Sequence, residues 1–351
     1  MANAYETSRM TTPLPPLRRV PLDGRGPEDV VVDAAGRVLT GVEDGRILRL
    51  DPLPKGAAGA EAAGDGASGA AGSSSGSGAS AAPRAEVVAR TGGRPLGLEP
   101  LPDGGVLVCD ARRGLLRVNP SDGTVRTLAD TVGGSPLRFC SNAAATADGT
   151  VYFSVSSRRY PLEDWLGDIL EHSGTGQLVR LRPGGTPEVV LDGLQFANGV
   201  ALAPDESFVT VAETGSRRLT RLWLTGPQAG QRDVLADDLP GYPDNMSRGS
   251  GGLFWVALAG PRSTGLERLH RAKPALRHAA WSVARRVRPR PGPLSGVLAV
   301  DADGRIVHDL RRRSPDYRMV TSVCEHDGHL VLGSLHERAL ALCELPSTSR
   351  G

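Results

Sequence analysis

The stretch Gly241-Tyr242-Pro243-Asp244-Asn245-Met246 places two adjacent oxygen-bearing side chains shortly before an apolar run, residues 253–258, that reads as a strand. A similar arrangement recurs along the chain, where a short polar side chain or carboxylate stands about six to eight residues ahead of an Asp-Gly-type turn and an apolar strand follows. The earlier cases are Glu28, Asn142 and Asn198. If each unit is one blade of a propeller, these residues meet around a common axis and form a single site.

Groups of short strands extend in both directions from this stretch, at the roughly ten-residue spacing of an antiparallel meander. The intervals from Asn142 to Asn198 and from Asn198 to Asp244 fit the roughly 45 residues of a four-stranded repeat. The 45 glycines and 27 prolines suit many tight turns. We therefore predict an all-β protein, a six-bladed β-propeller of four-stranded blades, with residues 296–344 forming the last group of strands.

Four segments fall outside this pattern. Residues 55–85 are almost entirely Ala, Gly and Ser, which predicts a disordered insertion because such a run buries too little apolar surface to offset the entropy of ordering. Residues 1–20 are rich in proline and predict a flexible arm, and residues 347–351 predict a short tail. Residues 265–288 predict a helical insertion. The expected organisation is one propeller over residues 21–346.

The predicted helix at 265–288 carries a broad apolar stripe and many arginines. A basic amphipathic helix of this kind can lie on a membrane surface. A surface helix that packs on its own domain is the more common case, and it is the interpretation we favour.

The bulk composition excludes several classes. The chain carries 41 Lys and Arg against 39 Asp and Glu, so it lacks the strong basic field that nucleic-acid binding requires. Its four cysteines form no zinc-binding spacing and are expected to be buried and reduced. We find neither the apolar run of a signal peptide in residues 1–18 nor the roughly 18 apolar residues of a membrane span, so we expect a cytoplasmic protein.

Four motifs, in order along the chain, resemble the strictosidine synthase-like branch of the six-bladed propellers. That superfamily also includes senescence-marker/gluconolactonase proteins and paraoxonases. The motifs are Gly93-Arg94-Pro95-Leu96-Gly97-Leu98, Phe196-Ala197-Asn198-Gly199-Val200-Ala201-Leu202, Tyr242-Pro243-Asp244-Asn245 and Glu325-His326-Asp327-Gly328-His329-Leu330. Each motif alone is weak, but their order along nearly the whole chain is fairly specific.

The resemblance implies a catalytic calcium at the mouth of the central channel, on a ligand set that falls here on Glu28, Asn142, Asn198, Asp244 and Asn245. The chemistry of the set agrees, because carboxylates and amides are hard oxygen donors that suit Ca²⁺ or a similar divalent cation rather than zinc. The implied activity is hydrolysis of lactones or aryl esters, in which the metal polarises the carbonyl and Glu28 or Asp244 activates a water.

The chain departs from its relatives at two positions. Leu96 stands where paraoxonases carry a histidine, and Thr321 stands where true strictosidine synthases carry the glutamate of their condensation reaction. We therefore expect no such condensation. The alternative function is a non-hydrolytic propeller that serves as a binding or scaffold module or acts in specialised metabolism.

Two further residues are candidates for contact with a small-molecule substrate. Arg94 could reach the channel mouth, although a salt bridge that stabilises a blade is an equal alternative. His336 lies in a turn that could face the pocket, whereas a single histidine in a turn is more often structural or solvated. For Glu28, Asn198 and Asp244 the alternative role is local turn chemistry, since Asn and Asp commonly bond their own backbone.

Overall fold

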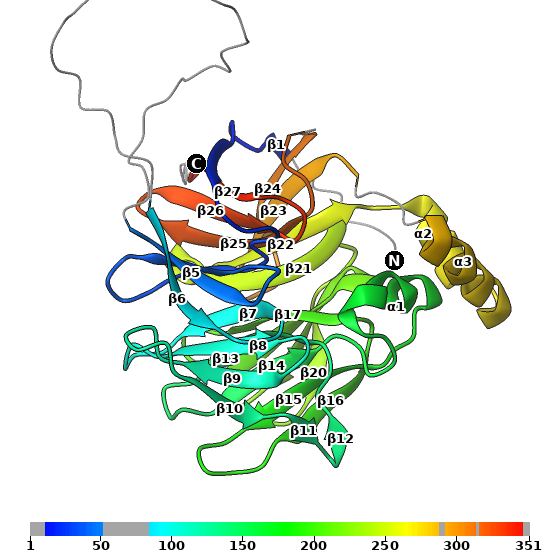
Figure 1. Cartoon of the computed structure of the whole chain (residues 1–351). Helices are drawn as coiled ribbons and strands as arrows, with labels where there is room; N and C mark the ends of the chain where they lie inside the picture. Colours follow the sequence, from blue (N-terminus) through cyan, green and yellow to red (C-terminus); the bar gives the residue numbers. More distant parts are fainter. Residues whose placement is uncertain (1–10, 52–83, 288–291, 314–315, 347–351) are drawn as a thin grey trace, which may run out of the picture.

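Strands in the middle of each repeat are apolar on both faces. Every residue of Val106–Asp110 (β8) and of Val151–Val155 (β14) is buried. A strand is buried on both faces only when its sheet lies between two others, so this pattern requires sheets that pack face to face. The computed structural model, which describes residues 11–51, 84–287, 292–313 and 316–346, has this arrangement: six blades around a central channel (Figure 1). The predicted six-bladed β-propeller is confirmed.

Each blade contains a four-stranded antiparallel sheet. The strand named first for each sheet below lies next to the central channel, except in the blade of β2, where the last-named strand, β25, does. The sheets are β3 (Val30–Val32), β4 (Val38–Gly41), β5 (Arg46–Asp51) and β6 (Arg84–Arg90); β7 (Pro95–Pro100), β8, β9 (Gly114–Val118) and β10 (Val125–Ala129); β13 (Cys140–Ala145), β14, β15 (Gly176–Leu181) and β16 (Glu188–Leu194); β17 (Ala197–Leu202), β18 (Phe208–Glu213), β19 (Arg218–Trp223) and β20 (Arg232–Ala236); β21 (Gly241–Arg248), β22 (Phe254–Pro261), β23 (Leu294–Val300) and β24 (Ile306–Arg313); and β2 (Arg18–Pro21), β27 (Ala339–Glu344), β26 (His329–Ser334) and β25 (Val320–His326). A small hairpin, β11 (Thr131–Val132) and β12 (Ser135–Pro136), follows β10.

The ring is closed by the N-terminal part of the chain. Strand β2 pairs antiparallel with β27, so the outermost strand of the last blade comes from the start of the sequence. Strand β1 (Thr12–Pro13) pairs in parallel with β24. The predicted flexible arm over residues 1–20 is therefore wrong for its described part, because residues 12–13 and 18–21 are strands whose backbone groups are paired. Residues 1–10 lie outside the described part of the chain.

The predicted start of the last group of strands, at residue 296, is also wrong. Strands β23 and β24 belong to the fifth blade, where they pair with β22, and the sixth blade begins only at Val320. The helical insertion between β22 and β23 separates the two halves of the fifth blade, and this gap conceals the repeat in the sequence.

The helical insertion contains two helices rather than the single helix predicted for residues 265–288. Helix α2 (Thr264–His270) begins after Ser263, whose Oγ accepts a hydrogen bond from the Leu266 amide at 3.3 Å. Helix α3 (Pro274–Val287) begins at a proline, which is favoured at the first position of a helix and disfavoured inside one. Both lie beside α1 (Trp165–Glu171), which follows a short 3₁₀ turn (Leu162–Asp164) inside the third blade (Figure 1).

Several predictions on the rest of the chain have separate outcomes. The four cysteines are free and buried, as predicted. The Ala/Gly/Ser insertion lies outside the described residues, apart from residues 84 and 85 in β6, and the tail from residue 347 also lies outside them. In the described ranges, none of the helices has the length and apolar character needed to cross a bilayer.

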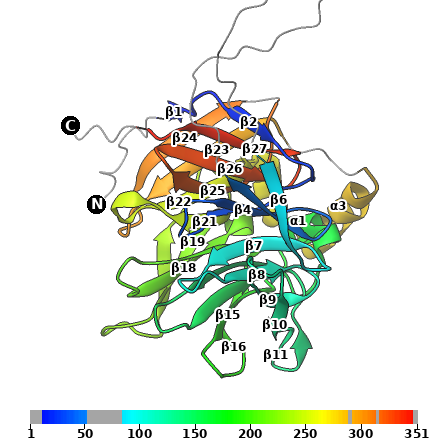
Figure 2. The same cartoon turned by 60° about the vertical axis from the view of Figure 1, so that its left-hand side comes forward.

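Glycines allow neighbouring blades to approach closely at the channel. A Cβ at Gly97 in β7 would lie 2.4 Å from the Ser141 carbonyl oxygen, and a Cβ at Gly199 in β17 would lie 2.5 Å from the Asp244 carbonyl oxygen. The inner strands of adjacent blades therefore touch backbone to backbone at this level. Figure 2 shows the inner strands β7 and β21 near the middle of the molecule.

The closing strand provides a test of the fold. Val20 is 1% exposed and packs in the core between the first and last blades. We expect Val20→Asp to lower the free energy of unfolding by about 3 kcal/mol or more, because it buries a carboxylate without a partner. Arg19→Ala on the same strand removes an exposed hydrogen bond to the Asp316 backbone oxygen and an ion pair with Glu337, and it is expected to cost less than about 1 kcal/mol. Urea denaturation measures both, and equal losses would contradict the role of β2 in closing the ring.

Candidate functional site

One residue from each blade faces a pocket at one end of the central channel. These six residues, here called the upper ring, lie within or just before the inner strand of each blade, and all are buried: Glu28, Leu96, Ser141, Asn198, Asp244 and Thr321. In five of the blades the pairing of the inner strand shifts register at this point. A bulge re-aims side chains, and here it helps to direct them toward the channel axis.

The acidic part of the upper ring is formed by residues that are distant in sequence. The Asn245 side-chain amide donates a hydrogen bond to Glu28 Oε1 at 3.1 Å, and the Thr321 hydroxyl donates to the Glu28 backbone oxygen at 2.6 Å. Ser141 Oγ donates to Asn198 Oδ1 at 2.8 Å. Three buried oxygens in this group have no hydrogen-bond partner among the described residues: Glu28 Oε2, Asp244 Oδ1 and Asn245 Oδ1.

The electrostatics of the upper ring are unfavourable without a cation. Burial raises the pKa of Glu28 well above its usual value, and the neighbouring charges of Asp244 and Asp29 raise it further. Burial likewise raises the pKa of Asp244 to about 8, although a hydrogen bond from Asn198 opposes the shift. The positive charge of Arg94 opposes this shift and lowers the pKa of Glu28. The two carboxylates therefore resist ionisation together.

These residues fit a hard divalent cation. The described residues hold no cluster of three or more His, Cys, Asp or Glu side chains placed to bind a metal, so the fit rests on carboxylates combined with amides. Glu28, Asn198, Asp244 and Asn245 supply that combination, and the three unpartnered oxygens belong to it. Calcium takes six to eight oxygen ligands, so such a set leaves positions for water and substrate. The geometry brings four of the five predicted ligands together.

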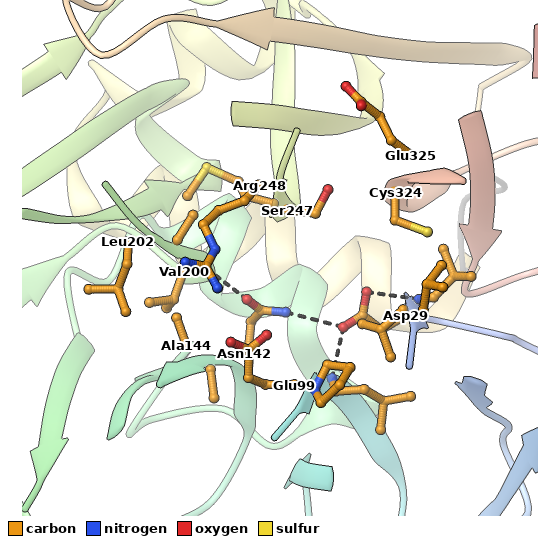
Figure 3. Close-up of a pocket in the computed structure, with 18 residues that line it drawn as sticks. Asp29, Glu99, Asn142, Ala144, Val200, Leu202, Ser247, Arg248, Cys324 and Glu325 are labelled. Atoms are coloured by element: carbon orange, nitrogen blue, oxygen red, sulfur yellow. Dashed lines mark hydrogen bonds between the residues drawn. The ribbon is translucent and has the colours of Figure 1, made fainter. Parts of the chain in front are cut away.

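Asn142 does not face the upper pocket, although its neighbour in the sequence does. Ser141 takes the place in the upper ring, and Asn142 lines a second cavity of about 280 Å³ toward the other end of the channel (Figure 3). Its Nδ2 donates to Asp29 Oδ2 at 3.3 Å, and its Oδ1 accepts from the Val200 amide at 2.8 Å. Both ends of this amide are thus already engaged in hydrogen bonds.

The walls of the upper pocket are apolar, and the sequence analysis did not identify them. The pocket has a volume of about 330 Å³. Its wall comes largely from Leu162, Trp165, Leu166 and Ile169 around α1, Leu266 of α2, Phe139, Phe196, Met319 and Leu335. Phe139 and Phe196 meet edge to face with ring centroids 5.4 Å apart. The sequence signal for this wall was limited to the apolar residues of a short helix between two strands. The contact between α1 and α2 joins segments about a hundred residues apart, so it leaves no local pattern.

The two predicted substrate-contacting residues do not line the pocket. Arg94 is 3% exposed and donates from Nη2 to the Gly26 carbonyl oxygen at 2.9 Å, so it lies behind Glu28 within the wall of the channel. His336 is exposed in a turn where its amide bonds Ser334 Oγ at 3.1 Å, and the preceding residue, Leu335, faces the pocket instead. Leu96 and Thr321, the two departures from the related enzymes, both line the pocket.

Comparisons with known proteins agree with this architecture. The strictosidine synthase family model matches residues 143–227, and the model for the N-terminal part of strictosidine synthase-like proteins matches residues 13–50. Strictosidine synthase-like protein 10 of Arabidopsis thaliana is 39% identical over 239 residues, which cover 66% of this chain and 60% of that protein. The adipocyte plasma membrane-associated protein of Rattus norvegicus is 35% identical over 272 residues, covering 73% of this chain and 70% of that protein. The chain spans less than two thirds of the length of some of these relatives, including the plant protein.

Solved structures show the same fold at low identity. A gluconolactonase from Xanthomonas campestris superimposes with a TM-score of 0.61 at 17% identity, over 94% of this chain and 89% of that one. A calcium-binding protein described as regucalcin, from Agrobacterium tumefaciens, superimposes with a TM-score of 0.58 at 14% identity, over 92% of both chains. At these identities the likeness concerns the propeller itself.

The buried carboxylates predict an unusual dependence of stability on pH. Well below pH 4, Asp244 is protonated in both the folded and the unfolded state and has no effect on stability. As the pH rises toward the folded-state pKa of about 8, the unfolded chain ionises first, so wild-type stability falls. In the presence of a chelator we therefore expect Asp244→Asn to be more stable than the wild type by at least about 1 kcal/mol at pH 8, and nearly equal to it at pH 4. Chemical denaturation at the two pH values measures this, and a variant less stable at pH 8 would refute it.

Proposed function

The chain belongs to the strictosidine synthase-like family of six-bladed β-propellers, and on that basis we propose that it is a calcium-dependent hydrolase of lactones or esters. The observation that carries the proposal is the set of three unpartnered, buried oxygens on Glu28, Asp244 and Asn245, of which the two carboxylates line an apolar pocket. A carboxylate pair that is costly to bury and keeps one unpartnered oxygen on each member is typical of a functional site rather than of a scaffold.

The residues divide the chemistry between them. Glu28, Asn198, Asp244 and Asn245 would hold calcium, which when bound would supply positive charge that polarises the ester carbonyl. We take Asp244 as the general base, because its unpartnered Oδ1 lies on a carboxylate that lines the apolar pocket. It would take a proton from the attacking water as the new carbon–oxygen bond forms, and return it to the alcohol oxygen as the ester bond breaks.

The pocket points to a substrate with an apolar portion. Leucines, aromatic rings and Met319 surround the acidic patch, while the described lining contains no Lys, Arg or His that could pair with an anionic substrate. An aryl ester or an alkyl-substituted lactone would place its carbonyl at the carboxylates and its apolar part against α1 and α2. A volume of about 330 Å³ is at the small end of the range for ligand pockets.

One observation favours the alternative of a non-hydrolytic binding propeller. Leu96 and Thr321 leave the upper ring without the imidazole or the third carboxylate that the related enzymes use at these two positions. Activity then depends wholly on Glu28 and Asp244. If a metal binds and no ester or lactone is turned over, the alternative is the better description.

Calcium titration by calorimetry tests the proposed site. We expect the wild type to bind calcium and to hydrolyse phenyl acetate or a γ-lactone in a reaction that a chelator abolishes. Asp244→Asn should lose calcium binding and reduce kcat/KM by about 100-fold or more, since it removes both a ligand charge and the proposed base. Glu99→Gln is the matched control, because Glu99 is a carboxylate that lines the opposite cavity. An Asp244→Asn variant with wild-type binding and turnover would contradict the assignment.

The apolar wall predicts a separate effect on substrate binding. Trp165 lines the pocket from α1 and makes none of the hydrogen bonds of the acidic group. We expect Trp165→Ala to raise KM for phenyl acetate by about tenfold through the loss of apolar contact, with calcium affinity unchanged. Steady-state kinetics and calorimetry on the same sample measure both quantities. An unchanged KM would show that the substrate does not reach α1.

A further inference from the structure

Helix α3 exposes an apolar stripe along one side. Leu276 and Val283 are each 59% exposed and Val287 is 71% exposed, which makes them the most exposed large hydrophobic side chains of the described chain. They are separated by seven and four residues, so they lie on one face of the helix, and the partly buried Ala280 falls between them. A continuous stripe of this kind on one helix differs from scattered exposed apolar residues.

The opposite side of α3 holds the helix in this orientation. Trp281 is buried against α1, and its ring lies 5.9 Å from that of Tyr160 in an edge-to-face contact. His278 Nδ1 lies 2.7 Å from Glu171 Oε1, next to the Arg159–Glu171 ion pair. In α2, His270 Nε2 lies 2.8 Å from the Ile169 backbone oxygen. Because these contacts anchor both helices to α1, the apolar stripe cannot turn inward without breaking them.

The charge around the stripe is strongly positive. Residues 262–287 contain seven Lys and Arg and a single acid, Glu267, whose carboxylate is already paired with Arg217 and Arg262. Six of these cations form no ion pair with the residues that the structure describes: Arg268, Arg271, Lys273, Arg277, Arg285 and Arg286. An apolar strip bordered by unpaired cations is complementary to a surface with an apolar interior and an anionic rim.

The same helices border the candidate active site. Leu266 of α2 and the residues of α1 form the wall of the upper pocket, and α3 runs along α1 at the edge of the molecule (Figure 1). A surface that met the apolar stripe would therefore lie beside the pocket.

We propose that helices α2 and α3 dock the propeller onto an anionic lipid surface. Leu276, Val283 and Val287 then insert at the boundary between the lipid headgroups and the acyl chains, and the cations contact the lipid phosphate groups. The pocket wall formed by α1 and α2 then lies next to the lipid. The docking is independent of the proposed hydrolysis, because it rests on the exposed stripe and its charges rather than on the carboxylates.

Vesicle co-sedimentation tests the docking without reference to activity. We expect the full chain to bind vesicles of phosphatidylcholine mixed with phosphatidylglycerol about tenfold more tightly than vesicles of phosphatidylcholine alone, and to lose that preference in high salt. A variant with Leu276→Ser, Val283→Ser and Val287→Ser should bind the mixed vesicles at least about tenfold more weakly. These side chains are exposed, so the variant should remain folded, as circular dichroism would verify.

A matched control carries the same changes elsewhere. Val189→Ser, Val234→Ser and Val307→Ser alter three valines that are 39%, 44% and 47% exposed on outer strands of the blades. This control should bind vesicles as the wild type does. Equal weakening in both variants, or no binding of the wild type to anionic vesicles, would overturn the proposal. So would light scattering that shows a dimer which only the α3 variant disrupts, because the stripe would then join two copies of this chain.

Discussion

Closure of the ring is the constraint on which the rest of the structure depends. A blade is buried on both faces only when it has two neighbours, and the last blade obtains its outermost strand from residues 18–21 at the other end of the chain. That pairing brings residue 28 beside strand β25, where Thr321 holds the Glu28 backbone, 293 positions away in sequence. The Asn245–Glu28 hydrogen bond joins residues 217 positions apart. The candidate site thus exists only in the closed ring, and folding assembles it as a consequence of burying the core.

The carboxyl groups at the centre of the channel are costly to bury in their ionised form. Glu28, Asp29 and Asp244 are buried within one region, and burial raises the pKa of each. Asp29 is compensated by hydrogen bonds from the Leu98 and Val30 amides and from Asn142, whereas Glu28 and Asp244 each keep an oxygen without a partner. The lower residues therefore behave as structural groups. The upper ring carries the unfavourable charge, and a bound cation would relieve it.

The repeat pattern was sufficient to predict the blades, because alternating apolar strands and Asp-Gly turns are local signals. It also located three positions of the upper ring, since Glu28, Asn198 and Asp244 occupy equivalent places in it. A one-residue offset has no signal in that pattern: Ser141 and Asn142 are adjacent, and Ser141, at the register shift in β13, is the one that lines the upper pocket. The apolar wall and the closing strand were missed because both depend on contacts between distant segments, and the two-helix insertion hid the boundary of the fifth blade.

A single experiment can test directly whether the upper ring binds a divalent cation. A crystal structure of the protein grown with calcium would decide it. We expect electron density for a bound ion between Glu28, Asn198, Asp244 and Asn245, with oxygen ligands at about 2.3–2.6 Å. Density held only by Asp29 and Asn142 in the lower cavity, or none in the channel at saturating calcium, would contradict it.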